Sequence, residues 1–336
     1  MNVRRIPTRS GSRQADHYRR DHPPDKDQRH VGTGPQAHGK MIFMPAEVST
    51  KATLTVLEAR HLSRIPWLVH GFSTRVCGFS RVYGGQALNL GFTKHDSRSA
   101  VERNRRAFLK ELGANHGNKP WPLATLRQIH SDLIHLVTSP PKGTLAGDGL
   151  VTDTAEILLG VQTADCLPVI LVDSKHRAVG VFHAGWRGTV KRIVEKGVGE
   201  MRRWFSTEAR HIKAAIGPGI HGCCYEVGPE VREKFDSQFG YAADLFREVK
   251  ESDPIREKYP LLFLSARAPG HTELPTKIFL DLVEANRRQL IDAGVLPKNI
   301  SASKLCTACC PDFLFSYRAE NGVTGRMMGV VGVRKE

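Results

Sequence analysis

The segment ADCLPVILVDSKHRAVGVFHAGWRG (residues 164–188) contains two short apolar runs, LPVILVD and AVGVFHAG, with the polar residues SKHR between them. Short runs that are rich in Val and Ile and bounded by polar turn residues are typical of buried strands. Cys166 directly precedes the first run, and His183 lies near the end of the second. If the two strands are neighbours that end together, this thiol and this imidazole lie close to each other.

Similar segments occur on both sides and predict the fold class. Strand-like runs are LVHGFSTR (68–75), LATLRQIH (123–130), IHLV (134–137), GLVT (149–152), ILLGVQT (157–163), IKAAIGPGI (212–220) and MMGVVGVR (327–334). Helical patterns occupy residues 97–113, a segment that begins near Trp186, and residues 227–239 and 276–294. Strands mixed irregularly with helices predict a layered α/β or α+β sandwich, not a barrel. We expect a single catalytic domain over residues 50–333.

Residues 1–40 differ from the rest of the chain. They contain nine Lys and Arg against four Asp and Glu, and almost no aliphatic residues. Such a segment cannot bury enough apolar area to offset the entropy lost on ordering. We predict a disordered basic N-terminal extension.

Composition limits the cellular location. The sequence has no apolar stretch of about 18 residues and no secretory signal, which predicts a cytoplasmic protein that does not enter the membrane. In that compartment the seven cysteines are expected to be reduced.

The net charge of +15 raises the question of nucleic-acid binding. A third of this charge lies in the N-terminal extension, and the remainder is spread over almost 300 residues without a compact basic run. We therefore expect small anionic substrates such as phosphates, with no nucleic acid as the main partner. We also expect a monomer or homodimer.

The residues at the strand ends suggest chemistry. His130 also ends an apolar run, so two imidazoles and one thiol, from His130, Cys166 and His183, are available as ligands. Three such ligands suit zinc with one open coordination position, as in catalytic sites. Cys166 and His183 are also candidates for a nucleophile and its base, with the neighbouring Asp165 as an orienting group or proton carrier. Alternatively, these residues are core filler and hydrogen-bonded strand ends.

Other motifs allow more than one interpretation. Arg75, Arg187 and Arg326 each lie next to small residues in a loop, where a guanidinium can bind phosphate or form a surface salt bridge. The cysteines in GCC (222–224) and CTACC (306–310) are either loop residues or a four-thiolate zinc site, although the adjacent cysteines of GCC lack a ligand-like spacing. No H-x-H pair occurs anywhere, which argues against a multicopper oxidase.

Several longer motifs occur in a specific order. They are HGFSTR, LNLG, VERNRR, RQIHSD, TADCLPV, HAGWRG, GPGI followed by CYEVG, and FSYRAENGVTGR. Over about residues 50–333 the chain resembles the YfiH-like family, also called laccase-domain or polyphenol oxidase proteins. The resemblance implies a layered αββα-type sandwich, similar to the fold of deamidating toxins that use a Cys/His pair. It also implies Zn²⁺ ligands at His130, Cys166 and His183.

The activity implied by the resemblance is that of a zinc-dependent purine nucleoside phosphorylase with adenosine deaminase activity. The implied substrates are adenosine, inosine, guanosine and 5′-methylthioadenosine. Alternatives are a polyphenol oxidase that binds Cu²⁺ at the same site, and a cysteine or metal amide hydrolase that acts on cell-wall precursors. The segment VCGFSRVYGG (76–85) and the sequence SYRAE depart from the usual GGVS and SYRRD, which affects the expected substrate contacts.

Overall fold

The computed structural model describes residues 54–140, 142–250, 258 and 276–335. The predicted disorder of residues 1–40 concerns residues outside this range. Among the described residues, no helix has the length and apolar character needed to cross a membrane.

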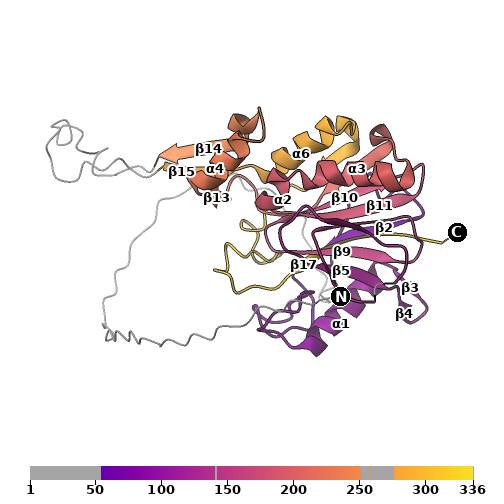
Figure 1. Ribbon diagram of the computed structural model, residues 1–336. Helices are drawn as coiled ribbons and strands as arrows, with labels where there is room; N and C mark the ends of the chain where they lie inside the picture. The colour runs from indigo at the N-terminus through magenta and orange to yellow at the C-terminus, as the bar shows by residue number, and fades with distance from the viewer. Residues whose placement is uncertain (1–53, 141, 251–257, 259–275, 336) are drawn as a thin grey trace, which may run out of the picture. The chain divides into compact units, whose positions relative to one another are not determined.

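Two six-stranded sheets form the centre of the fold (Figure 1). The first has the order β1 (Val56–Leu57), β2 (Leu68–Ser73), β17 (Met327–Val333), β9 (Leu158–Thr163), β5 (Leu123–Arg127) and β7 (Leu145–Ala146). The second has the order β16 (Ile300–Ala302), β12 (Ile212–Ile216), β10 (Leu167–Asp173), β11 (Ala178–Ala184), β8 (Gly149–Thr152) and β6 (Ile134–Leu136). Each expected strand run therefore contributes a strand to one of these two sheets.

The strands are apolar on both faces because each sheet is covered on both sides. In β10, Val169 and Leu171 join the core cluster beneath the helices. Ile170 and Val172 point the other way and join the cluster between the two sheets, together with Val331 of β17. Side chains alternate between the faces of a strand, so a strand buried on both faces reads as one continuous apolar run.

Helices form the two outer layers (Figure 1). On the second sheet lie α2 (Trp186–Val190), α3 (Ile193–Phe205), α4 (Pro229–Asp236) and α6 (Leu282–Asp292), which share one core cluster with its strands. On the outer face of the first sheet lies α1 (Arg98–Glu111), whose Phe108 and Leu109 pack near Val330 of β17. The predicted single-domain αββα-type sandwich is confirmed.

Smaller elements complete the described part of the chain. They are the sheet of β13 (Glu226–Val227), β15 (Thr276–Leu280) and β14 (Phe246–Lys250), the hairpin of β3 (Asn115–His116) and β4 (Lys119–Pro120), and the 3₁₀ turns η1 (Ala209–His211), η2 (Ala242–Leu245) and η4 (Pro297–Asn299).

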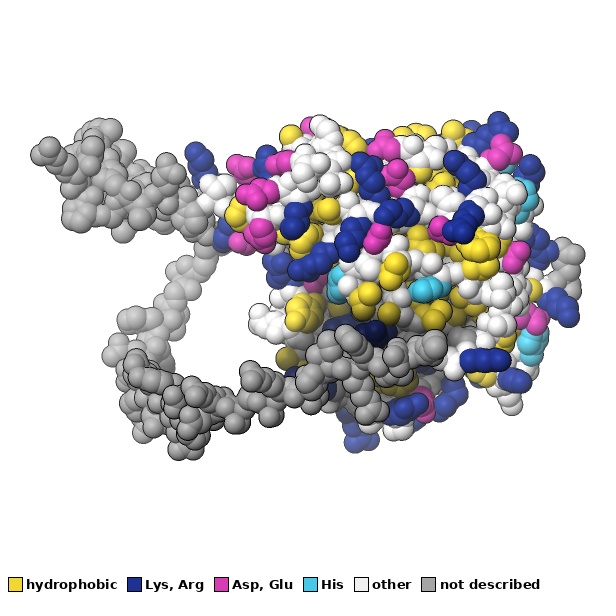
Figure 2. Space-filling model, viewed as in Figure 1, with side chains coloured by type: hydrophobic (Ala, Val, Ile, Leu, Met, Phe, Trp, Pro, Cys, Tyr) yellow, Lys and Arg dark blue, Asp and Glu magenta, His cyan; other side chains and the backbone are white. Residues whose placement is uncertain are grey.

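On the face of the molecule in Figure 2, acidic side chains are interspersed among the Lys and Arg side chains.

The helix predicted over residues 97–113 is confirmed by its caps. The Ser97 hydroxyl accepts a hydrogen bond from the Ala100 amide at 3.2 Å, which satisfies one of the unpaired N–H groups of the first turn. Gly113 follows the helix with φ +63°, a left-handed conformation that glycine adopts without steric cost.

The helix predicted over residues 276–294 is wrong in its first five residues. Residues Thr276–Leu280 form β15, the central strand of the small sheet, which pairs with β14 on one side and β13 on the other. The helix begins only after Asp281, whose carboxylate accepts the Glu284 amide at 2.9 Å. Pairing with two neighbouring strands overrides the local helical pattern of this segment.

The helix expected from Trp186 onward is divided into α2 and α3. Arg192 interrupts it in a left-handed conformation (φ 63°). The carbonyl of Thr189 at the end of α2 accepts the Arg192 amide at 2.9 Å and the Gln289 side chain of α6 at 2.7 Å. These bonds end α2 after five residues.

Candidate active site

Strand pairing brings Cys166 and His183 together. In the antiparallel β10–β11 pair, Pro168 lies opposite His183 and Leu167 opposite Ala184. Cys166 directly precedes β10, so its thiol lies beside the end of β11. His130 arrives from the loop between β5 in the first sheet and β6 in the second. The site thus forms where ends of both sheets meet.

We call His130, Cys166 and His183 the histidine–cysteine trio. Their candidate ligand atoms all lie within 4.8 Å of one another. The distance from Cys166 Sγ to His130 Nε2 is 3.9 Å, and the two imidazole centroids are 4.9 Å apart at an angle of 71°. A Cβ atom on Gly185 would lie 2.8 Å from the Cys166 sulfur. Only glycine at this position leaves the space beside the thiol open.

Asp148 orients the trio, and the sequence reasoning did not identify it. His183 Nδ1 donates to Asp148 Oδ1 at 2.8 Å, and the amides of His130 and Ser131 donate to the same carboxylate at 3.1 and 2.6 Å. This carboxylate fixes the His183 ring so that Nε2 remains for a ligand, as carboxylates bonded to metal-ligating histidines do in other metal sites. The sequence feature that could have identified Asp148 is its position between two glycines at the start of the buried run GLVT.

The charges of these groups support one another. Burial by itself raises the pKa of Cys166, but the neighbouring His183 and the hydrogen bond with His130 lower it to about 6. Burial lowers the pKa of His183, while Cys166 and Asp148 raise it to about 9. The pKa of Asp148, which burial alone would raise, falls to about 2 because His183 and Ser131 donate to it. The metal-free site therefore favours a thiolate beside an imidazolium.

The trio opens into a cavity of about 650 Å³. Its lining comprises Leu126, Gln128, His130, Gln162, Ala164, Asp165, Cys166, His183, Trp186, Arg187, Tyr225, Tyr317, Arg318 and Arg326. Aromatic rings and guanidinium groups thus surround the candidate ligands. This combination suits a flat, aromatic, anionic substrate or substrate pair.

Asp165 lines the cavity beside Cys166 but is held by protein donors. Its Oδ1 accepts the Thr307 hydroxyl at 2.6 Å, and its Oδ2 accepts the Arg318 amide at 2.7 Å. The residue is buried and has a left-handed backbone (φ 92°), which is uncommon outside glycine. Asp148, and not Asp165, makes the bond that orients His183.

The three predicted arginines lie in different places. Arg187 lines the cavity and stacks on the Trp186 ring at 4.3 Å. Arg326 also lines it, and its Nη1 donates to the carbonyls of Thr324 and Gly325.

Arg75 lies outside this lining. It donates to the carbonyls of Pro311 and Tyr83 and forms an ion pair with Glu320 at 3.2 Å. Arg318, which was not singled out from the sequence, lines the cavity in its place. The sequence feature that could have identified Arg318 is its position within the motif FSYRAENGVTGR.

The donor set can be compared with the needs of a metal ion. Two imidazoles, one thiol and a space kept clear by Gly185 match a zinc site that has three protein ligands and one open position. A blue-copper site also needs a weak axial ligand, usually methionine. None of the described residues that line the cavity is a methionine.

Comparisons with known proteins show the family and the fold of this chain. Residues 69–334 match the family model described as multi-copper polyphenol oxidoreductase laccase. The crystal structure of the hypothetical protein YfiH from Bacillus licheniformis has a TM-score of 0.67 and 30% identity, over 80% of this chain and 93% of that chain.

Two curated relatives carry activities in their names. The purine nucleoside phosphorylase YlmD from Geobacillus stearothermophilus is 33% identical over 80% of this chain and 95% of its own length. The adenosine deaminase RL5 from an unknown prokaryotic organism is 40% identical over 53% of this chain and 59% of its own length.

Proposed function

Because this chain belongs to the laccase-domain family that includes YfiH and YlmD, we propose that it is a zinc-dependent purine nucleoside phosphorylase. The observation that carries the proposal is the convergence of the histidine–cysteine trio on a cavity that Arg187, Arg318 and Arg326 also line. We propose that the substrates are adenosine, inosine, guanosine and 5′-methylthioadenosine, each with inorganic phosphate.

The reaction needs an anion held beside a leaving purine. Phosphate attacks C1′ of the nucleoside, the bond from C1′ to the purine nitrogen breaks, and the base leaves with the electron pair and takes up a proton. Ribose 1-phosphate is the other product, or its 5-methylthio analogue from 5′-methylthioadenosine. The transition state carries positive charge on the sugar, so catalysis depends on positioning and electrostatics. A zinc ion bound by the trio would supply a Lewis acid at the end of the cavity.

The lining residues suit these two partners. Guanidinium groups of Arg187 and Arg326 are proposed to bind phosphate, because a planar fork of N–H groups matches its oxygens. Trp186 and Tyr317 offer aromatic surfaces for the purine and sugar. Burial raises the pKa of Tyr225, so its phenol remains a hydrogen-bond donor at neutral pH. Arg75 is bonded elsewhere and is better suited to holding its loop.

Deamination of adenosine is the second reaction proposed for the same cavity. Water attacks C6, the bond from C6 to the amino nitrogen breaks, and ammonia leaves with a proton from the water. Asp165 is the proposed carrier of that proton, because it lines the cavity. An Asp165→Asn variant with normal zinc content and unchanged deamination would rule this role out.

An amide hydrolase, for example one acting on cell-wall precursors, is the alternative that a specific observation favours. Cys166, His183 and Asp148 have the order of a nucleophile, a base and an orienting carboxylate. Such an enzyme would work without metal and would be inactivated by iodoacetamide. A Cu²⁺-dependent polyphenol oxidase, which the family description suggests, would instead consume oxygen.

One experiment separates these functions. Bound metal and phosphate-dependent release of hypoxanthine from inosine are measured on the full chain, with Cys166→Ala as the test variant. The matched control is Cys310→Ser, a half-buried cysteine outside the cavity lining. Phosphate-dependent release that Cys166→Ala abolishes supports the phosphorylase. Phosphate-dependent release of hypoxanthine by the chelated, metal-free protein would contradict a zinc-dependent phosphorylase.

A further inference from the structure

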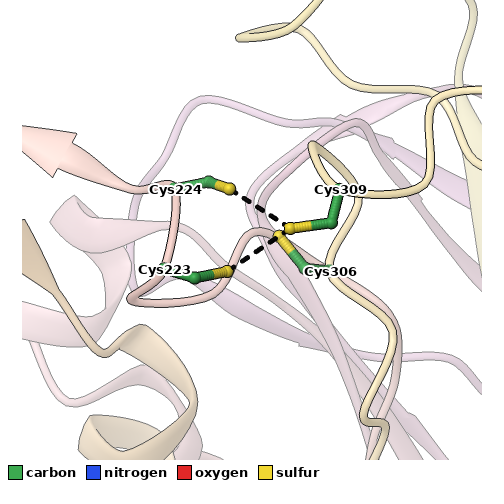
Figure 3. Close-up of side chains that lie close together, drawn as sticks. All are labelled: Cys223, Cys224, Cys306 and Cys309. Carbon is green, nitrogen blue, oxygen red and sulfur yellow. Dashed lines mark hydrogen bonds between the residues drawn. The ribbon is translucent and has the colours of Figure 1, made fainter. Parts of the chain in front are cut away.

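A second group of thiols lies apart from the histidine–cysteine trio. The sulfur atoms of Cys223, Cys224, Cys306 and Cys309, here called the four-cysteine cluster, all lie within 4.8 Å of one another. Figure 3 shows the four side chains pointing toward a common centre from two segments of the chain. None of these residues lines the cavity of the active site.

The spacing of the sulfur atoms fits a single tetrahedral ion. Four sulfur atoms at about 2.3 Å from a zinc ion lie about 3.8 Å from one another. The sulfur of Cys309 lies 3.5 Å from that of Cys223 and 3.3 Å from that of Cys224 (Figure 3). Small shifts would place all four at ligand distance around one centre.

The backbone builds this arrangement. The amide of Cys310 donates to the carbonyl of Cys306, which closes a turn that places Cys306 and Cys309 on one side. In the other segment the amides of Cys224 and Tyr225 donate to the His221 carbonyl at 2.9 Å. Because that turn is tight, two adjacent cysteines can both face the partner segment, although their spacing in the sequence is not ligand-like.

One sulfur atom of the cluster, that of Cys306, has a backbone donor beside it. The His221 amide donates to the sulfur of Cys306 at 3.5 Å, a bond that stabilises a ligating sulfur. Four thiolates around a divalent cation leave a net negative charge. Guanidinium groups bind the same segment: Arg247 donates to the Gly222 carbonyl and Arg318 to the Glu226 carbonyl.

We propose that the four-cysteine cluster binds one zinc ion, which fastens these two segments together. The contacts around it lead to the active site. Thr307, next to Cys306, donates from its amide to the Gly219 carbonyl and from its hydroxyl to Asp165. Ile220 in turn donates to the Asp165 carbonyl at 2.8 Å. The ion therefore supports the cavity wall and takes no part in the reaction.

The test measures zinc per chain in protein purified under reducing conditions, with variants that separate the two sites. Wild type should carry about two zinc ions per chain, and Cys166→Ala about one. Cys309→Ser should also carry about one, whereas Cys310→Ser, the neighbouring cysteine outside the cluster, should keep both. Cys309 is exposed, so its replacement by serine leaves the core intact, unlike replacement of the buried Cys306.

Cobalt gives a second readout that is independent of activity. Cys166→Ala loaded with Co²⁺ should show the visible bands of a tetrahedral ion and intense sulfur-to-cobalt charge transfer, both absent after the further change Cys309→Ser. Loss of all zinc in Cys166→Ala, or unchanged zinc in Cys309→Ser, would overturn the proposal. The proposal would also be overturned if freshly purified protein had a disulfide within the cluster and the cluster bound no zinc after that disulfide was reduced. None of these results depends on whether the chain is a phosphorylase.

Discussion

The histidine–cysteine trio and the four-cysteine cluster use the same kind of ligand in opposite ways. The trio combines two nitrogens with one sulfur and faces a cavity, so a four-coordinate ion bound there would keep one position open. The cluster has four sulfurs and lies outside that cavity, so an ion bound there would have no open position. An open position allows chemistry on a substrate, whereas a closed set of four thiolates supplies folding energy. The difference separates a site for reaction from a site for structure.

The two sites also differ in what holds their ligands. Cys166 and His183 stand at the ends of paired central strands, and a buried carboxylate, Asp148, fixes the imidazole. Such support exists before any ion binds. The cluster instead joins two irregular segments near residues 223 and 306, where the ion itself would supply much of the order. Removal of metal should therefore cost activity at the trio and stability at the cluster.

The largest expected effect is that of Cys166→Ala on activity. Loss of this ligand removes the metal from the trio and with it several kcal/mol of transition-state stabilisation, so kcat/KM for phosphorolysis should fall by about 10³-fold. Cys310→Ser should retain wild-type activity. The thermal unfolding temperature of Cys166→Ala should change little, because the surrounding strands pack without the metal. A variant that keeps its activity and loses stability would reverse the assigned roles of the two sites.

Asp148→Asn is expected to have the next largest effect. The amide cannot accept from His183, His130 and Ser131 as the carboxylate does, so the imidazole loses its orientation. Zinc affinity of the trio should fall by roughly 10- to 100-fold, as it does when other carboxylates bonded to metal-ligating histidines are replaced. Competition with a chromophoric chelator in a Cys309→Ser background measures this affinity at one site. Unchanged affinity would mean that the strands alone position His183.

Thiol reactivity of the metal-free, reduced protein should separate the sites next. The pKa of Cys166 is lowered to about 6, so this thiol is mostly ionised at pH 7 and reacts more slowly only as the pH falls through 6. The pKa of Cys223 is raised to about 11, chiefly by burial and the bond with Cys309, so it ionises only as the pH rises toward 11.

After allowance for the lower nucleophilicity of the more acidic thiol, iodoacetamide at pH 7 should modify Cys166 roughly 50 times faster than Cys223. Mass spectrometry of tryptic peptides over time measures both rates. Equal rates would remove the electrostatic contrast between the two sites.

Much of the difference between the trio and the four-cysteine cluster could be predicted from the sequence. The apolar runs of β10 and β11 predicted buried strands, and their ends placed Cys166 near His183. Asp148 was missed because an Asp between glycines also reads as an ordinary turn. The cysteine cluster remained one of two alternatives because residues 223 and 306 meet only through tertiary packing. Residues 276–280 were misassigned since their strand pairing overrides a helical pattern that continues into α6.

A smaller effect is expected from Cys309→Ser on stability. Loss of the second zinc frees the segment around Cys306 from the segment around Cys223, at a cost of about 2 kcal/mol, which lowers the unfolding temperature by roughly 3–4 °C. Chelator should lower the unfolding temperature of wild type by a similar amount, but that of Cys309→Ser much less. An equal response of both proteins to chelator would place the stabilising ion at the trio.

The smallest effect tests whether the two sites communicate. Thr307→Val removes the hydroxyl that donates to Asp165 at 2.6 Å, while Thr307→Ser keeps it. A hydrogen bond to a buried carboxylate contributes about 1.5–3 kcal/mol, of which a fraction reaches the substrate, so kcat/KM should fall a few-fold in the valine variant and recover with serine.

The second ion could act by positioning the Thr307 hydroxyl for its hydrogen bond to Asp165. In that case the effects of Thr307→Val and Cys309→Ser on kcat/KM should not add, because both variants break the same series of contacts. Fully additive effects would mean that the cluster stabilises the fold without influencing the cavity. The two sites would then share only the kind of side chain that forms them.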